Sequence, residues 1–314
     1  MAELLTVTFV VSLFSGMIRI ATPIIYSSLG ELVTERSGIL NLGVEGTMLM
    51  GAFVGFLTAY KTHSLWLGYV FAMLAGGGLG LLMAFLSSTL KVDQIVAGLT
   101  INLLSSGLTF YLYRLAFKDV ASANMPNIEI LRTVPIPLLS QIPVLGEIFF
   151  KQGILTYIAF IAMAPLLYFF LYRTKHGLQL RCIGENPRAM EMKGVNIFSY
   201  QYLAVIFGGV LAGIGGGFLV LSYSGMFLPY IVGGRGWIAI AIVIFGDWKP
   251  FRILFMALFF GFLDSIQLQI QGLGIQFPYQ ALLALPYVLT IVALVFGRRR
   301  AGAPLALGIR YDRG

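Results

Sequence analysis

The feature that most constrains this chain is a series of nine apolar runs, which together take up most of its 314 residues. A helix needs about 20 mostly apolar residues to cross a membrane, and only one of the runs is clearly shorter. The runs are continuous rather than alternating, which argues against barrel strands, and backbone groups in lipid must bond within their own helix. We therefore expect an all-α, polytopic transmembrane helix bundle of about eight to ten spans. The runs cover residues 4–26, 38–60, 66–90, 94–114, 152–172, 200–222, 231–246, 251–271 and 279–297.

Composition supports a multi-pass membrane protein in contact with the lipid bilayer. Hydrophobic types make up 58% of the residues and charged types 11%, against about 45–50% and about 25% in ordinary soluble domains. The net charge of +8 comes largely from basic residues in two short stretches. That pattern is typical of cytoplasmic loops and needs no nucleic-acid partner. The single cysteine and the two widely separated histidines predict neither a disulfide nor a metal site.

The basic residues also predict the orientation. They cluster in residues 173–196 and 298–314, which we expect to be cytoplasmic, and an even number of runs separates the two stretches. The Pro-rich loop 115–151 and the N-terminus then lie outside. We therefore expect one transmembrane domain, residues 1–314, made of a first half, an external loop, a linking span, a cytoplasmic coupling loop, a second half and a tail. These parts are 1–114, 115–151, 152–172, 173–196, 197–297 and 298–314.

Two Gly-rich, charge-bearing segments interrupt the halves, at residues 30–46 and 233–250. Because the halves have opposite predicted orientation, this pattern favours an inverted repeat with broken helices, which places substrate sites near the membrane midplane. Asn41 and Glu45 sit among apolar residues and glycines, so they are candidates for the substrate path.

The charged residues that precede them have a simpler interpretation. Glu31, Glu35 and Arg36 lie where the first run ends and the second begins. A nine-span topology predicts that they form a solvated cytoplasmic turn.

Small residues recur every four positions in two runs, which lets helix backbones approach closely. We expect close helix packing there. The residues are Ala72, Gly76, Gly80 and Ala84 in one run, and Gly208, Ala212 and Gly216 beside Gly209, Gly213 and Gly217 in the other.

Two further runs carry polar stripes, which inside a span usually face the bundle or a water-filled cavity. For the first stripe, interhelical hydrogen bonding and a translocation path are equally good interpretations. For Asp264 in the second stripe a functional role is favoured, with a structural ion pair as the alternative. The stripes are Asn102, Ser105, Ser106 and Thr109, and Asp264, Gln267 and Gln271.

The most specific local signal lies in the basic loop. Asn186 is a good N-cap, Pro187 suits the first helical position and Gly194 suits the residue after the C-cap. A helix of about two turns cannot be stable alone, so it must pack on the membrane face or on a partner. Glu185 and Glu191 give the loop mixed charge, which favours a protein partner.

Catalytic motifs are missing from the sequence. It has no G-x-x-x-x-G-K-[ST], no H-E-x-x-H and no G-x-S-x-G. We therefore expect no enzyme activity and no ATP binding through a P-loop.

Residues 30–46, GELVTERSGILNLGVEG, and 183–190, IGENPRAM, resemble an ABC-importer inner-membrane permease of the branched-chain amino acid/ribose permease superfamily. The resemblance is closest to bacterial nucleoside and simple-sugar permeases, and it covers residues 5–300. It implies a second permease subunit, homologous or identical, two cytoplasmic ATPase subunits and an extracytoplasmic substrate-binding protein or lipoprotein. This chain itself would need no cofactor, because the partner ATPase subunits would bind ATP and Mg.

The resemblance also implies roles for particular residues. Segment 184–194 matches the coupling helix that docks on the ATPase, which makes Gly184, Glu185, Asn186, Pro187, Arg188 and Glu191 the expected coupling residues. Segment 37–46 matches a stretch near the translocation path, and its sequence is closest to that of nucleoside permeases. A nucleoside path would suit Asn102, Gln267 and Gln271 as hydrogen-bonding groups and Trp237 as a stacking surface.

Other functions stay open at this point. The resemblance also fits an ABC permease for simple sugars or branched-chain amino acids. An ion-coupled secondary transporter could use Asp264 or Glu45 and would need no ATPase. An integral-membrane enzyme would need a catalytic constellation that the sequence does not show.

Overall fold

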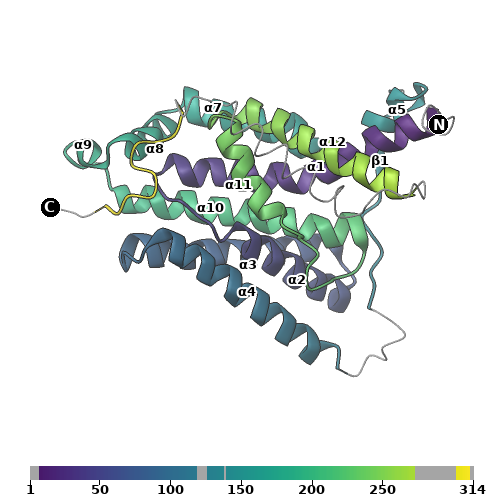
Figure 1. Cartoon of the computed structure of the whole chain (residues 1–314), viewed down its shortest axis with the longest axis horizontal. Coiled ribbons are helices and arrows are strands. Elements are labelled where there is room, and N and C mark those ends of the chain that lie inside the picture. The colour runs from purple at the N-terminus through teal and green to yellow at the C-terminus, as the bar shows by residue number, and fades with distance from the viewer. Residues whose placement is uncertain (1–6, 119–125, 138, 273–301, 312–314) are drawn as a thin grey trace.

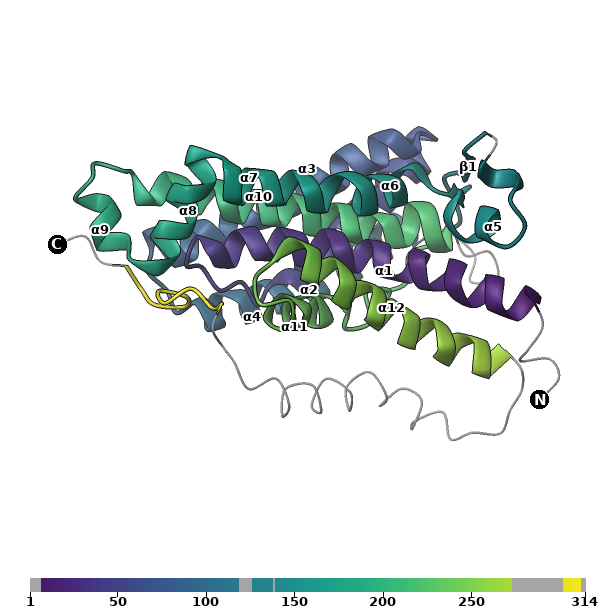
Figure 2. The same ribbon diagram turned by 90° about the horizontal axis from the view of Figure 1, so that it is seen from above.

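The computed structural model describes residues 7–118, 126–137, 139–272 and 302–311. These residues form an elongated helical bundle (Figures 1 and 2). The main helices are α1 (Val7–Arg36), α2 (Val44–Thr62), α3 (Leu65–Ala84), α4 (Gln94–Ala116), α6 (Ile154–Tyr157), α7 (Ala164–Arg173), α8 (Lys175–Glu185), α9 (Pro187–Glu191), α10 (Ile197–Phe218), α11 (Arg235–Phe245) and α12 (Pro250–Gly272).

Shorter elements complete the bundle. Three π-helical segments extend or join helices, namely η2 (Phe85–Thr89), η4 (Ile158–Met163) and η5 (Leu219–Ser224). The loop between α4 and α6 holds η3 (Leu139–Gln141), α5 (Leu145–Phe149) and an antiparallel pair of two-residue strands, β1 (Val134–Pro135) and β2 (Lys151–Gln152).

The helices correspond to the apolar runs of the sequence. Eight of the nine runs are helical, and the ninth, 279–297, lies outside the described residues. Six helices of the described part are long and apolar enough to cross a membrane, and α11 is a shorter apolar helix. The prediction of an all-α, polytopic membrane bundle is confirmed.

The two ends of the bundle carry different segments (Figures 1 and 2). Helices α8 and α9 lie at one end, together with residues 302–311. The N-terminus of α1 lies at the opposite end, with α5 and β1. The basic loop 173–196 is thus separated by the length of the bundle from α5 and β1, which belong to the loop 115–151. The side of the membrane that each loop faces stays a prediction.

Helix α10 is the most buried of the six long helices and packs against α1, α2 and α3. Its glycine ridge meets the small-residue ridge of α3, as expected. A Cβ atom on Gly76 would lie 2.2 Å from the carbonyl oxygen of Gly209, and one on Gly213 would lie 2.3 Å from that of Ala72. Only glycine permits this approach, so the two backbones are in direct contact.

Helix α1 is longer than the first apolar run. It continues to Arg36, and the side chains of Glu31, Glu35 and Arg36 are buried. The expectation of a solvated turn is therefore wrong. The physical reason is that all three charged side chains have buried partners. Glu31 accepts a hydrogen bond from the amide of buried Asn41 at 3.2 Å. Glu35 accepts a hydrogen bond from the indole Nε1 of Trp248 at 2.5 Å, and Arg36 donates to the Trp248 carbonyl oxygen at 2.9 Å.

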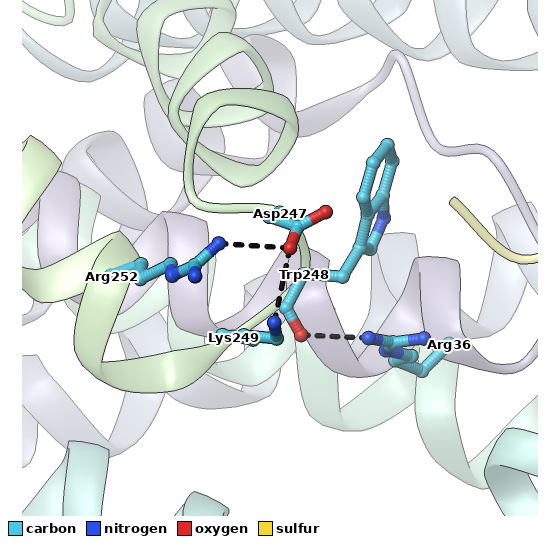
Figure 3. Close-up of polar contacts among 5 residues, drawn as sticks. All are labelled: Arg36, Asp247, Trp248, Lys249 and Arg252. Atoms are coloured by element: carbon cyan, nitrogen blue, oxygen red, sulfur yellow. Dashed lines mark hydrogen bonds and ion pairs between the residues drawn. The ribbon is translucent and has the colours of Figure 1, made fainter. Parts of the chain in front are cut away.

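The turn between α11 and α12 supplies these partners (Figure 3). Asp247 and Trp248 both have positive φ, at 54° and 52°. Asp247 pairs with Lys249 at 3.1 Å and with Arg252 at 2.9 Å. The turn thus joins the C-terminal end of α1 to the start of α12.

Candidate functional site

Two non-helical segments interrupt the bundle. The first lies within the predicted segment 30–46, whereas the second lies mainly before the predicted segment 233–250, most of which is the helix α11. The first broken segment, residues 37–43, runs from the end of α1 to the start of α2. The second broken segment, residues 225–234, runs from the end of η5 to the start of α11. Unpaired backbone groups inside a membrane protein cost free energy, so the question is what satisfies them.

Side chains of neighbouring helices bind the first broken segment. Gln94, the first residue of α4, accepts a hydrogen bond from the Leu40 amide at 2.7 Å. Glu31 of α1 accepts one from the Asn41 amide at 3.2 Å. The side chain of Asn41 itself accepts from the Gly43 amide at 2.9 Å and is buried. Asn41 therefore shapes the backbone of this segment.

Asn102 of α4 binds the same segment where α2 begins. Its amide nitrogen donates to the Leu42 carbonyl oxygen at 2.8 Å, and its oxygen accepts from the Gly46 amide at 2.7 Å. Both ends of this side chain are therefore used within the protein. Of the two interpretations of Asn102, the contacts correspond to the structural one.

Glu45 connects the two broken segments. One carboxylate oxygen accepts a hydrogen bond from the Gly234 amide at 2.8 Å, and the other accepts from the Gly236 amide at 2.7 Å. Glu45 also lies in the first turn of its own helix, α2. A carboxylate is stabilised at the positive end of a helix, and this one serves α2 and α11 together. The backbones meet there, because a Cβ atom on Gly236 would lie 2.5 Å from the Glu45 Cα atom.

Three other polar or aromatic side chains lie near the contact between Glu45 and the start of α11. Arg235 donates to the Val232 carbonyl oxygen at 3.0 Å. Asp264 of α12 is half-buried and close enough to Arg235 for their charges to interact. Trp237, in the first turn of α11, is 42% exposed. We call Glu45, Arg235, Trp237 and Asp264 the midbundle junction.

The remaining predicted path residues divide between two sides of the bundle. Gln267 and Gln271 are half-buried on α12, one and two turns beyond Asp264. The stripe on α4 lies apart from them, since α4 packs against α2 whereas α12 packs against α1, α7 and α11 (Figure 1).

The C-terminal part of the α4 stripe makes contacts within α4 itself. Ser105 and Thr109 are buried, and the Thr109 hydroxyl donates to the Ser105 carbonyl oxygen at 2.7 Å. Ser106 is exposed. The structure therefore brings Glu45, Trp237 and Asp264 together. Of the α4 stripe, Asn102 reaches this junction, at the Gly46 amide beside Glu45, whereas Ser105, Ser106 and Thr109 lie further along α4.

Residues 184–194, which we call the coupling segment, have the local structure that their sequence predicts. Asn186 caps α9 by accepting a hydrogen bond from the Ala189 amide at 3.2 Å, and Pro187 begins the helix. Gly194 has φ of 76° and follows the last turn. Gly184 is buried, whereas Glu185 and Arg188 are exposed and Glu191 is half-buried.

Sequence reasoning missed several residues of both regions. Arg235 and Gln94 were not selected, because a basic residue or an amide beside a run gives no signal of its partner. Trp248 was not connected to Glu35, which is 213 positions away. Met192 was passed over, because the sequence does not show that its side chain is 84% exposed.

The fold and the midbundle junction define a multi-pass membrane permease built around two broken helices that meet at one carboxylate. The chain belongs to the family of branched-chain amino acid transport system permease components, whose model matches residues 13–295.

Curated relatives agree with this assignment. The chain is 39% identical over 279 residues, 88% of this chain and 83% of the relative, to a putative glucose ABC transporter permease protein, TsgC13, of Haloferax volcanii. It is 36% identical over 302 residues to the guanosine ABC transporter permease protein NupQ of Bacillus subtilis, covering 94% of both chains. It is 35% identical over 307 residues to the nucleoside ABC transporter permease protein NupC of Lactococcus lactis, covering 95% of both. No solved structure matches the chain at a significant level.

Proposed function

We propose that this chain is the membrane-spanning permease subunit of an ATP-driven importer for nucleosides or a related small polar solute. The observation that carries the proposal is the similarity to two nucleoside or guanosine permeases along nearly the whole of both chains. A simple sugar is the second candidate, because a relative of similar identity is described as a putative glucose permease.

The midbundle junction is consistent with an uncharged substrate. Helix N-termini at broken helices can bind anionic substrate groups. Here the carboxylate of Glu45 already accepts the Gly234 and Gly236 amides at the start of α11. The site therefore does not call for a negative charge on the solute. The exposed ring of Trp237 offers a surface on which a nucleobase can stack.

We infer a division of labour between this chain and its partners. A second permease subunit, identical or homologous, completes the path, and an extracytoplasmic binding protein or lipoprotein delivers the solute. Two cytoplasmic ATPase subunits bind ATP and Mg and dock on the segment 184–194. Exposed Arg188, Met192 and Lys193 at α9 would supply the docking contacts.

Uptake of radiolabelled nucleosides by cells with and without this gene tests the proposal. We expect uptake that depends on the gene and on ATP and survives an ionophore. Uptake that the ionophore abolishes while ATP is maintained would contradict it and favour an ion-coupled transporter that uses Asp264 or Glu45. Gene-dependent uptake of a sugar, with none of nucleosides, would move the substrate to the second candidate.

The docking contacts have their own test. Met192→Asp and Arg188→Glu should lower co-purification of the ATPase and lower uptake, with the protein still in the membrane. Tyr230→Asp is the matched control, because Tyr230 is 85% exposed in the second broken segment, away from α9. If the α9 variants behave like the control, the docking role is wrong.

A further inference from the structure

Residues 302–311, which we call the C-terminal strap, lie across the end of the bundle that carries α8 and α9 (Figures 1 and 2). Within the strap, Pro304 and Ala306 are buried. Its turn is closed by its own backbone, since the Leu307 amide donates to the Pro304 carbonyl oxygen at 3.2 Å and the Ile309 amide donates to that of Ala306 at 3.1 Å. The strap is therefore a packed and internally bonded element.

One side of the strap binds the coupling segment. The Ala306 amide donates to the Gly184 carbonyl oxygen at 2.8 Å. The Leu305 amide donates to a carboxylate oxygen of Glu185 at 3.3 Å, and the Tyr311 hydroxyl donates to Glu191. Contacts at both ends of the short coupling segment would make the strap move with it.

The other side of the strap binds the first broken segment. The Gly308 amide donates to the Gly38 carbonyl oxygen at 3.1 Å. Arg310 also donates to the carbonyl oxygen of Lys91, in the connection between η2 and α4. The hydrogen bonds to Gly184 and Gly38 come from positions only two residues apart in one closed turn. A displacement of the coupling segment would therefore reach Gly38 through very little intervening chain.

We propose that the C-terminal strap transmits movement of the coupling segment, residues 184–194, to the first broken segment, which leads directly into Glu45. This inference rests on the proposed function, because it takes ATP-driven movement at the coupling segment as its input. Coupling between distant sites needs a contiguous element that both sites bias, and the strap is in hydrogen-bond contact with both. It supplements the direct packing of Gly184 against the Arg36 carbonyl oxygen at the end of α1.

Two variants remove strap contacts, each with a matched control. Ala306→Pro removes the amide that donates to Gly184, and Leu305→Ser changes a neighbouring side chain that is 76% exposed while keeping its amide. Tyr311→Phe removes the hydroxyl that donates to Glu191, and Tyr111→Phe makes the same change on α4 at a side chain that is 63% exposed.

The first readout is transport by the assembled transporter in cells. We expect Ala306→Pro to lower ATP-dependent uptake about tenfold and Tyr311→Phe about two- to fivefold, with ATPase subunits still co-purifying and both controls near wild type. Uptake within about twofold of wild type for Ala306→Pro, at equal membrane level, would overturn the proposal. Should Ala306→Pro fail to reach the membrane, wild-type uptake and exchange in Tyr311→Phe would overturn it.

The second readout is hydrogen exchange of the purified transporter. Loss of strap contacts should speed exchange of the amides of residues 37–43, which the controls leave unchanged. Unchanged exchange in this segment in Ala306→Pro would overturn the proposal. This readout needs no substrate, so it separates the two claims. If the wild type does not take up nucleosides, the proposed substrate fails, while the exchange result still decides the role of the strap.

Discussion

The two broken segments differ in what binds them. The first, residues 37–43, is largely buried, and side chains from α1 and α4 accept from or donate to its backbone. The second, residues 225–234, has large exposed side chains at Leu228 and Tyr230. At its far end, where α11 begins, the bonds to another helix are those that Glu45 accepts from Gly234 and Gly236. The first segment is thus bonded to side chains of several helices, whereas the side-chain hydrogen bonds that join the start of α11 to α2 come from one carboxylate.

This difference suggests how a single chain combines a stable frame with a site that can change. Amides bonded to buried side chains of several helices move together with those side chains, because separating them would leave several polar groups unpaired. A helix start held by one carboxylate can move at the cost of two hydrogen bonds. We therefore expect variants in the first segment to affect stability mainly, and variants at α11 to affect transport mainly.

Removal of the Glu45 carboxylate should have the largest effect on transport. Glu45→Ala leaves the amides of half-buried Gly234 and buried Gly236 without this acceptor, each at a cost of about 1–3 kcal/mol, so uptake should fall about a hundredfold or more. Glu45→Gln keeps one acceptor oxygen and should fall about tenfold. Uptake measured at equal membrane level checks this. Near-wild-type uptake in Glu45→Ala would remove the basis of the comparison.

Asn102→Leu should have the next largest effect, and mainly on stability. It leaves the Leu42 carbonyl oxygen and the Gly46 amide unpaired, so we expect a loss of about 2–4 kcal/mol in the free energy of unfolding. The melting temperature of the purified protein measures it. Ser106→Leu, at an exposed position of the same helix, is the control and should be neutral. A normal melting temperature with abolished uptake would instead place Asn102 in the translocation path.

Gln94→Leu should show a smaller version of the same behaviour. It removes one acceptor, for the Leu40 amide, and should cost about 1–2 kcal/mol in stability. Denaturation of the purified variant beside Asn102→Leu gives the ratio of the two effects. A loss as large as that of Asn102→Leu would mean that Gln94 does more than bind this amide.

Trp237→Ala should have the smallest effect on stability, within about 0.5 kcal/mol, because its side chain is substantially exposed. Its effect should appear in transport, as a rise in the substrate concentration needed for half-maximal uptake. The conservative variant Trp237→Phe keeps an aromatic surface and should recover most of the affinity. Equal affinities in wild type and Trp237→Ala would argue against stacking.

Much of the fold could be predicted from the sequence, because apolar runs of membrane-spanning length determine helices locally. The cap at Asn186 and the glycine ridges followed from local rules in the same way. The extension of α1 to Arg36 could not be predicted, because burial of its charges depends on Trp248, which is brought close only by the tertiary fold.

The candidate site could also be predicted only in part. Asn41 and Glu45 could be selected because polar residues among glycines and apolar residues are conspicuous. Their partners Gly43, Gly234 and Gly236 offer backbone amides, which leave no mark in a sequence. The grouping of Asn102 with Asp264 in one path could not be checked from spacing, since the two helices pack on different sides of the bundle.

The most direct test of the central claim, that the solute passes the midbundle junction where α2 and α11 meet, is protection of a thiol placed there. The single native cysteine would first be removed by Cys182→Ser. Trp237→Cys in that background should react with a membrane-permeant thiol reagent. The transported nucleoside should slow the reaction, and the rate should change when the ATPase binds ATP. Leu103→Cys, on the outer side of α4 and 77% exposed, should show neither effect. Equal labelling of Trp237→Cys with and without solute, in a transporter that still takes the solute up, would contradict the claim that the solute passes the midbundle junction.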